Sequence, residues 1–140
     1  MTDQPRAVLF LCNRNAIRSP MAAVLLGHAG GPLAESAGVT PGEPDPLSEV
    51  VLGEIGLSIP TPPRHVEALK LGRFDLIVAL SPQAQHRALE LTRNLPTTVE
   101  FWHVADPSLV DGSREMRLAA YRSVRDDLAA KLKDRFPTGA

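Results

Sequence analysis

One cysteine and two residues that follow it could perform covalent chemistry on an oxyanion. Cys12 is the single cysteine among 140 residues, and it stands in the pattern Cys12-x5-Arg18-Ser19. A thiolate is a strong nucleophile, and a guanidinium can bind two oxygens of a tetrahedral anion at once, which an ammonium cannot do. The Ser19 hydroxyl can donate a hydrogen bond to the sulfur. The spacing therefore predicts a nucleophile and an oxyanion clamp in one short loop, without a metal ion.

The residues around this loop predict the elements that would position it. Residues 6–11 are a short apolar run without polar alternation, which is typical of a strand buried on both faces of a parallel sheet. After the loop, Ser19 is a good N-cap, Pro20 suits a first helical position and Gly30 would end the helix. Backbone N–H groups between such a strand and helix can point inward around an anion. The predicted oxyanion-binding residues therefore also include Asn13, Arg14, Asn15, Ala16 and Ile17.

The rest of the chain alternates strand and helix patterns. Further strands are predicted over residues 33–37, 74–80 and 97–102, and further helices over 46–54, 64–71, 82–94 and from 114 onward. The last helix carries apolar residues at near-helical spacing: Met116, Leu118, Tyr121, Val124, Leu128 and Leu132. Four strands alternating with helices predict an open parallel α/β sheet. The length suits one domain over residues 1–140.

A general acid could come from the loop after the last predicted strand. Asp106 lies there, on the same edge of the sheet as Cys12, and Pro107 restricts its backbone. The other interpretation of this Asp-Pro pair is a turn or helix cap. A second pair, Asp45-Pro46, has no strand before it, so we interpret it as a helix cap. Cys12 also has a structural interpretation, as a small buried residue at a strand end.

Composition excludes several classes of function. Fifteen basic against sixteen acidic residues leave a formal net charge of −1, so a general nucleic-acid binder is not expected. The four histidines share no metal-ligand spacing. No apolar run approaches the roughly 18 residues of a membrane helix, and the N-terminus lacks the apolar core of a signal peptide. We expect a cytoplasmic protein, a monomer or weak dimer, with no cofactor and no membrane partner.

Residues 8–22 resemble the phosphate-binding loop of the low-molecular-weight protein tyrosine phosphatase family, which includes the thioredoxin-coupled arsenate reductases. The likeness continues through residues 36–38, 74–77 and 106–107. The resemblance implies a four-stranded parallel sheet with helices on both faces, the phosphatase I-like fold. It implies that Cys12 is the nucleophile, Arg18 the oxyanion clamp and Asp106 the general acid. The polar residues implied to hold the loop in shape are Asn15, Ser19 and Ser36.

The chain departs from the family pattern at several positions. Arg14 stands where the family loop usually has glycine, so a left-handed backbone there would strain it. Ile17 replaces a second cysteine, and Ser81 stands where the reductases carry a relay cysteine. Ser108 and Leu109 follow the Asp-Pro pair, where the tyrosine phosphatases often place tyrosines. These departures weaken phosphotyrosine as the substrate but leave oxyanion chemistry intact.

Three functions follow from these residues. The first is a phosphomonoester hydrolase that acts through a phosphocysteine on a phosphorylated protein or small phosphomonoester. The second is an arsenate reductase that uses an external low-molecular-weight thiol, because one cysteine cannot form an internal relay. The third is an oxyanion-binding module with little turnover, in which Arg14 distorts the loop. In each case phosphate, sulfate or arsenate is an expected ligand. Arg64 could reach the site from a neighbouring loop, although a solvated surface position is the more common one for arginine.

Overall fold

A four-stranded parallel sheet forms the centre of the protein, in a computed structural model that describes residues 4–137. The strands are β1 (Ala7–Cys12), β2 (Leu33–Gly38), β3 (Leu76–Ala79) and β4 (Thr98–Phe101). They lie in the order β2-β1-β3-β4, and every neighbouring pair is parallel. The helices are α1 (Arg18–His28), α2 (Pro46–Gly53), α3 (Pro82–Leu91) and α4 (Arg114–Arg135). The predicted α/β class and strand order along the chain are confirmed.

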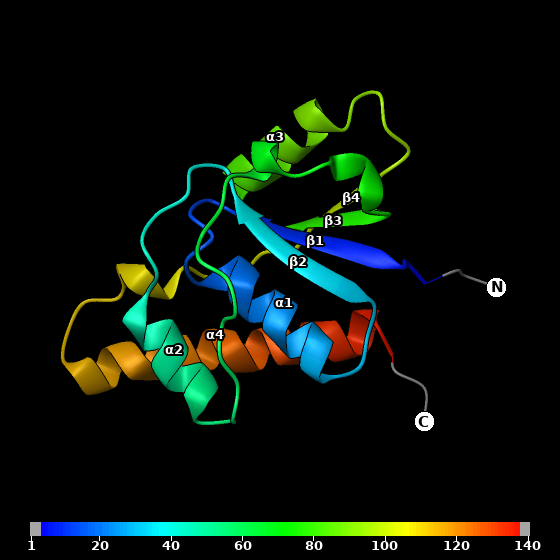
Figure 1. Ribbon diagram of the computed structural model, residues 1–140. Helices are drawn as coiled ribbons and strands as arrows, with labels where there is room; N and C mark the ends of the chain where they lie inside the picture. The colour runs from blue at the N-terminus through cyan, green and yellow to red at the C-terminus, as the bar shows by residue number, and fades with distance from the viewer. Residues whose placement is uncertain (1–3, 138–140) are drawn as a thin grey trace.

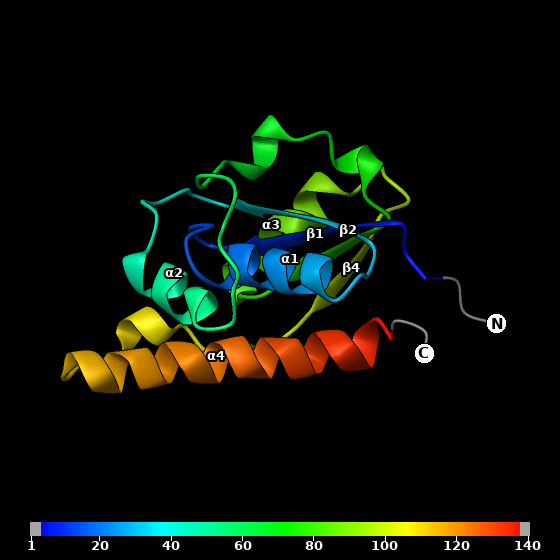
Figure 2. The same ribbon diagram turned by 60° about the horizontal axis from the view of Figure 1, so that its bottom comes forward.

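The helices cover both faces of the sheet, as the resemblance implied. Figure 1 and Figure 2 show α1, α2 and α4 on one face and α3 on the other. Successive side chains of β1 alternate between the two layers. Val8 and Phe10 pack with the α1, α2 and α4 side, whereas Leu9 and Leu11 pack with the α3 side. Because both layers are apolar, β1 is buried on both faces, and its position and direction are fixed by packing from above and below.

The strand order places a crevice at the carboxyl end of β1. The chain leaves β1 toward β2 on one side, and the later strands β3 and β4 lie on its other side. In open α/β sheets, ligands bind outside the carboxyl ends of strands at this kind of reversal. Cys12 is the last residue of β1, and Leu80 follows β3 directly. The fold therefore brings the ends of two distant segments to the predicted oxyanion loop.

Three of the predicted helix starts are confirmed by their caps. The side chains of Asp45, Ser81 and Ser113 accept hydrogen bonds from backbone N–H groups in the first turns of α2, α3 and α4. Proline occupies the first turn of α2 and of α3, where its missing N–H costs nothing. The interpretation of Asp45-Pro46 as a helix cap is therefore confirmed.

Two local predictions are wrong. The single helix predicted over residues 64–71 is instead two short 3₁₀ helices, η1 (Val66–Ala68) and η2 (Leu71–Arg73). The reason is that the Arg64 carbonyl accepts the Gly38 N–H, so the chain there is extended along the end of β2. Met116 was expected on the buried face of α4 but is 58% exposed, because it lies in the first turn, where its sulfur covers Gly112.

Candidate active site

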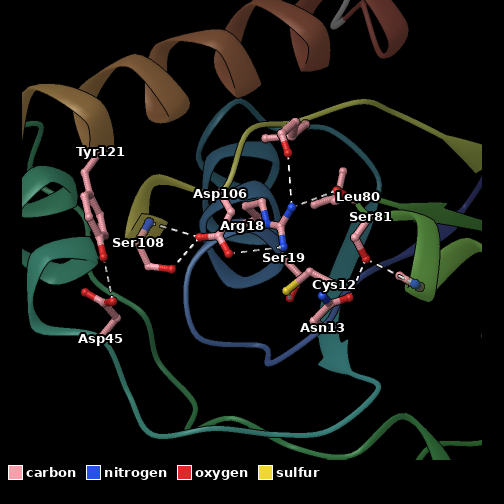
Figure 3. Close-up of polar contacts among 12 residues, drawn as sticks. Cys12, Asn13, Arg18, Ser19, Asp45, Leu80, Ser81, Asp106, Ser108 and Tyr121 are labelled. Carbon is pink, nitrogen blue, oxygen red and sulfur yellow. Dashed lines mark hydrogen bonds and ion pairs between the residues drawn. The ribbon is translucent and has the colours of Figure 1, made fainter. Parts of the chain in front are cut away.

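The thiol of Cys12 is buried at the bottom of a cavity at the carboxyl end of β1. Its Sγ lies 3.0 Å from Ser19 Oγ, and the same hydroxyl lies 3.2 Å from the Ala37 carbonyl oxygen. A hydroxyl has one proton that rotates to suit its partners. The Ser19 proton can therefore turn to the sulfur when the thiolate forms. This contact joins the end of the strand to the first turn of α1, as Figure 3 shows.

The start of α1 differs from the prediction because of this contact. The helix begins at Arg18, and Ile17 occupies the N-cap position without a side-chain hydrogen bond to the first turn. Ser19 lies inside the helix and is fully buried. Its hydroxyl bonds to the loop and to β2 instead of capping, so the predicted N-cap role is wrong. The N-terminal end of α1 lies beside the cavity, because Ile17 and Arg18 are among the lining residues, and the free N–H groups of a helix N-terminus suit an anion.

Asn15 holds the loop in its curled shape. Its backbone is left-handed, with φ of 54°, a conformation that asparagine tolerates better than most residues. Its Nδ2 donates to Ser19 Oγ at 2.8 Å and to Ser36 Oγ at 2.9 Å, while its Oδ1 accepts from the Arg64 N–H at 2.9 Å. These three partners lie in α1, in β2 and in the segment before η1. The structure therefore places the three predicted loop-support residues together and adds the Arg64 backbone to them.

The backbone strain expected at Arg14 is absent. Asn15 is the one non-glycine residue with positive φ in the part of the chain that the structure describes, so Arg14 does not take the left-handed conformation. The turn is made one position later than expected, by a residue type suited to it. The Arg14 carbonyl accepts a hydrogen bond from the Gly42 N–H at 2.9 Å, which ties the loop to the segment after β2. Arginine at this position is therefore compatible with a regular loop.

The Arg18 guanidinium is clamped by the ends of two strands. Its Nη1 donates to the Leu80 carbonyl at 3.2 Å and to the Val104 carbonyl at 3.1 Å. Its Nη2 lies 3.9 Å from Asp106 Oδ2, and the side chain is only 10% exposed. Because the two carbonyls fix the plane of the group, the guanidinium cannot swing away from the cavity. A planar group held in this way can donate hydrogen bonds to two oxygens of one anion.

Asp106 faces Arg18 from the loop after β4. Its Oδ1 accepts from the Ser108 N–H at 3.0 Å and from Ser108 Oγ at 2.6 Å, and its Oδ2 is directed at Arg18. Asp106 thus caps the short 3₁₀ helix η3 (Pro107–Leu109). The two interpretations of the Asp-Pro pair are compatible, since one oxygen caps and the other lies in the cavity. In Figure 3 the Asp106 carboxylate lies between Ser108 and Arg18.

A cavity of about 260 Å³ unites these side chains. The sequence-predicted residues that line it are Cys12, Asn13, Arg14, Ala16, Ile17, Arg18 and Asp106. Asn15, Ser19 and Ser36 lie behind the loop and outside the lining. The volume is at the small end of the range for ligand sites, so it suits a phosphate-sized anion with part of its leaving group. No aromatic side chain lines it within residues 4–137.

Sequence reasoning missed one wall of the cavity. Residues 43–46 and Ser108 complete the lining, and Asp45 also accepts a hydrogen bond from the Tyr121 hydroxyl at 2.8 Å. Burial, together with the Asp45 carboxylate, raises the pKa of Tyr121 above its ordinary value. The available signal was the position of this proline-rich segment directly after β2, whose carboxyl end meets the same edge of the sheet.

Two polar contacts behind the loop were also not predicted. Ser81 Oγ donates to Asn13 Oδ1, so a residue of the α3 cap supports the first loop position. The Arg64 guanidinium donates to the Ser36 carbonyl at 2.9 Å and to Glu35 at 2.8 Å. Arg64 is therefore part of the support of the loop and does not line the cavity.

Within residues 4–137, no group of three or more His, Cys, Asp or Glu side chains is placed to hold a metal ion. No helix of that part of the chain is both long and apolar enough to cross a membrane.

Comparison with known proteins identifies the family. A family model described as low molecular weight phosphotyrosine protein phosphatase matches residues 7–136. The chain belongs to this family. The low molecular weight phosphatase resemblance of residues 8–22 is therefore confirmed over nearly the whole chain.

Relatives within the low molecular weight phosphatase family carry two kinds of name. Arsenate reductase of Bacillus subtilis (strain 168) is 27% identical over 140 residues, which cover 96% of this chain and 97% of that protein. Protein-arginine-phosphatase of Geobacillus stearothermophilus is 33% identical, covering 89% of each chain. The crystal structure of arsenate reductase from Archaeoglobus fulgidus DSM 4304 has a TM-score of 0.71 at 30% identity, covering 91% of this chain and 96% of that one. The family thus includes cysteine-based phosphatases and arsenate reductases.

Proposed function

We propose that this protein is a phosphomonoester hydrolase that acts through a phosphocysteine intermediate. The observation that carries the proposal is the meeting of three groups in one small cavity: a buried thiol, a clamped guanidinium and a carboxylate, from Cys12, Arg18 and Asp106. The substrate is a phosphorylated protein or a small phosphomonoester. The family membership of the chain supports this chemistry.

In the first step the Cys12 thiolate attacks phosphorus opposite the leaving oxygen. A P–S bond forms, the P–O bond to the leaving group breaks, and the leaving oxygen takes the electron pair and a proton from Asp106. The loop N–H groups and Arg18 bind the three other phosphate oxygens, on which the charge is spread in the transition state. The hydrogen bond from Ser19 stabilises the thiolate before the attack.

In the second step water hydrolyses the phosphocysteine. Asp106, now a carboxylate, takes a proton from the water as its oxygen attacks phosphorus. The P–S bond breaks, the electron pair returns to the sulfur, and inorganic phosphate leaves. Ser19 Oγ, 3.0 Å from Sγ, donates to the departing thiolate. Asp106 therefore regains in the second step the proton that it gives up in the first.

The lining of the cavity supports alkyl as well as aryl leaving groups. Ser108 and Leu109 follow the Asp-Pro pair, and neither is aromatic. Ser108 is hydrogen-bonded to Asp106, and Leu109 is 78% exposed. The lining includes Pro44 and Pro46 but no aromatic side chain of residues 4–137, so a substrate ring would have no aromatic partner to stack on.

Arsenate reduction with an external thiol is the second candidate, favoured by the relatives that carry that name. Cys12 would displace water from arsenate to form a thiol–arsenate ester. Two equivalents of a low-molecular-weight thiol would supply two electrons and end as a disulfide, while arsenic leaves as arsenite and Cys12 is regenerated. An internal relay is excluded because Cys12 is the single cysteine. The third candidate is an oxyanion-binding module with little turnover. The left-handed backbone at Arg14 on which it is based is absent, so we rank it last.

Steady-state hydrolysis of p-nitrophenyl phosphate tests the proposal. We expect turnover by the wild type without added thiol, its abolition in Cys12→Ser and a fall of about 10²- to 10³-fold in Asp106→Asn, which keeps the shape but not the proton. Arsenate with and without added thiol is assayed in parallel. Thiol-dependent arsenite formation without phosphate release would reject the hydrolase in favour of the reductase.

A further inference from the structure

A second hollow lies beside the catalytic cavity. It has a volume of about 440 Å³ and is lined by Asn13, Arg14, Val39, Thr40, Pro41 and Gln83. Asn13 and Arg14 line both spaces, so the two spaces adjoin at these two residues. A ligand that extends from the catalytic cavity into this hollow would therefore pass beside Asn13 and Arg14.

The missing side chain of Gly42 leaves space for the Arg14 guanidinium. A Cβ on residue 42 would lie 2.7 Å from Arg14 Nε and 3.2 Å from its Cζ, so Gly42 leaves the space that the guanidinium occupies. The Gly42 N–H also donates to the Arg14 carbonyl at 2.9 Å. The backbone and the side chain of Arg14 thus both rest on the segment after β2.

The charge of Arg14 is not neutralised within residues 4–137. No carboxylate oxygen of that range lies within 4.0 Å of its guanidinium, whereas Arg18, Arg64 and five other arginines have ion-pair partners. The acidic residues Glu43 and Asp45 line the catalytic cavity but not the second hollow. The second hollow therefore has one charged side chain in its lining, and that charge is positive.

The other polar groups of the hollow suit the same kind of ligand. Thr40 contributes a hydroxyl and Gln83 an amide, and both can donate hydrogen bonds. Asn13 Oδ1 already accepts from Ser81 Oγ, so the Asn13 amide offers a donor to a ligand. A guanidinium surrounded by neutral donors is a setting for an anion with several oxygens.

We propose that this hollow binds a second anionic group of the substrate. The inference rests on the proposed function and narrows it: the phosphomonoester that enters the catalytic cavity carries a second phosphate or a carboxylate on its leaving group. Arg18 and the loop hold the reacting phosphate, and Arg14 holds the second anion. An arginine at this loop position thereby sets substrate preference.

A series of small bisphosphates and matched monophosphates tests the proposal. The substrates are the bisphosphates of ethanediol, propanediol and butanediol, the alkyl phosphates of equal length, and a carboxyalkyl phosphate as the carboxylate arm. Within each variant we compare kcat/KM per hydrolysable phosphate group for the substrates with a second anionic group and for the matched alkyl phosphates. Any general effect on the loop then cancels, and the two equivalent phosphates of a bisphosphate do not count as a preference. In the wild type we expect kcat/KM per phosphate group for the best bisphosphate to exceed that for the alkyl phosphate of equal length by about five- to tenfold. This is the range of one partly exposed charge pair with good geometry.

Three variants locate the preference. The ratio should fall to about 1 in Arg14→Ala and to an intermediate value in Arg14→Lys, which keeps the charge but not the planar fork. Gly42→Ala places a methyl group 2.7 Å from the Arg14 Nε, so the guanidinium must shift, and the ratio should fall without a change in charge. Arg93→Ala is the matched control, because it removes one exposed positive charge outside the linings of both spaces. Its ratio should equal that of the wild type.

A ratio of 1 in the wild type, or a preference that survives in Arg14→Ala, overturns the inference. Preference for the bisphosphate alone assigns the second anion as a phosphate, and equal preference for the carboxyalkyl phosphate assigns a general anion site. If the wild type hydrolyses neither these compounds nor p-nitrophenyl phosphate, the proposed function fails. Binding of the bisphosphate and of the alkyl phosphate to Cys12→Ser, measured by calorimetry, then decides the inference, as it also does if only p-nitrophenyl phosphate is hydrolysed. Tighter binding of the bisphosphate that is lost in Arg14→Ala supports the second site, and equal affinities reject it.

Discussion

The two sides of loop 12–18 differ in burial and in how their polar groups are satisfied. The buried side, here called the floor, consists of Cys12, Asn15, Arg18, Ser19 and Ser36, all at most 8% exposed and each with a partner within the protein. The open side, here called the rim, consists of Arg14, Glu43, Asp106 and Ser108 around the cavity mouth. The floor fixes the atoms that would react, and the rim leaves charged groups available to a substrate. We therefore expect floor substitutions to affect chemistry and stability. Rim substitutions should affect substrate choice, except at Asp106, whose carboxyl group is the proposed general acid.

The same substitution at two positions of the loop gives the largest expected contrast. Arg18→Lys keeps the charge but loses the planar donor that bonds both the Leu80 and Val104 carbonyls. We expect kcat/KM for p-nitrophenyl phosphate to fall by about 10²- to 10³-fold, the usual cost of losing a transition-state donor. Arg14→Lys on the rim should cost far less with this single-anion substrate. Comparable losses in the two variants would show that floor and rim do not differ in this way.

Asn15 tests the floor through stability. Asn15→Ala removes three hydrogen bonds and puts alanine, which tolerates a left-handed backbone less well than asparagine, at this position. We therefore expect a loss of about 2–4 kcal/mol in the free energy of unfolding. Asn15→Gly removes the same bonds but tolerates the backbone. The glycine variant should therefore be about 1–2 kcal/mol more stable than the alanine variant, measured by urea unfolding. Equal stabilities would mean that the backbone conformation at position 15 costs nothing.

The same contrast explains what could be predicted from the sequence. The buried run before Cys12, the Asp45 and Ser81 caps and the Cys12-x5-Arg18 spacing are local signals, and they led to the observed sheet and loop. The left-handed residue was not located, because Asn15 is held by Ser36 and the Arg64 N–H, which are distant in sequence. The hydroxyl of Ser19 was assigned to a cap because its competing partners lie on other elements.

The rim wall was missed for a related reason. Residues 43–46 have turn composition, and nothing local distinguishes a solvated turn from one that lines a cavity. Only the length of the segment after β2 and its return over the loop place Glu43 and Asp45 at the mouth. Charged groups at a rim are therefore harder to assign from sequence than a buried nucleophile.

Tyr121 holds the segment 43–46, which carries Glu43 of the rim, and its substitution should have a moderate effect on stability. Tyr121→Phe removes the hydrogen bond to Asp45, which we expect to cost about 1–2 kcal/mol near neutral pH. The pKa of Tyr121 is raised in the folded protein above its ordinary 10.0. Above that pH the unfolded chain ionises first, so the folded wild type binds more protons and its stability falls as pH rises. The phenylalanine variant lacks this group.

The difference in stability between wild type and Tyr121→Phe should therefore shrink between pH 9 and 11, measured by urea unfolding at each pH. Tyr121 is the single tyrosine of the chain, so tyrosinate absorbance reports its ionisation directly. A midpoint at the free value in the folded protein would contradict the raised pKa. Because Asp45 keeps its two backbone donors in α2, catalysis should change by less than about threefold.

Glu35 supports the floor from outside and gives the smallest effect. It bonds Arg73 and Arg64, and these hydrogen bonds hold its pKa below the ordinary 4.5. A lowered carboxylate pKa stabilises the folded state above pH 4.5, and this contribution is lost as pH falls through the folded value. Glu35→Gln should therefore be less stable than wild type by up to about 1 kcal/mol at pH 6, the range of partly exposed ion pairs, and the gap should narrow at pH 3. If the gap stays constant with pH, the Glu35 charge does not support Arg64, and the floor depends on the contacts of Arg64 to Asn15 and to the Ser36 carbonyl.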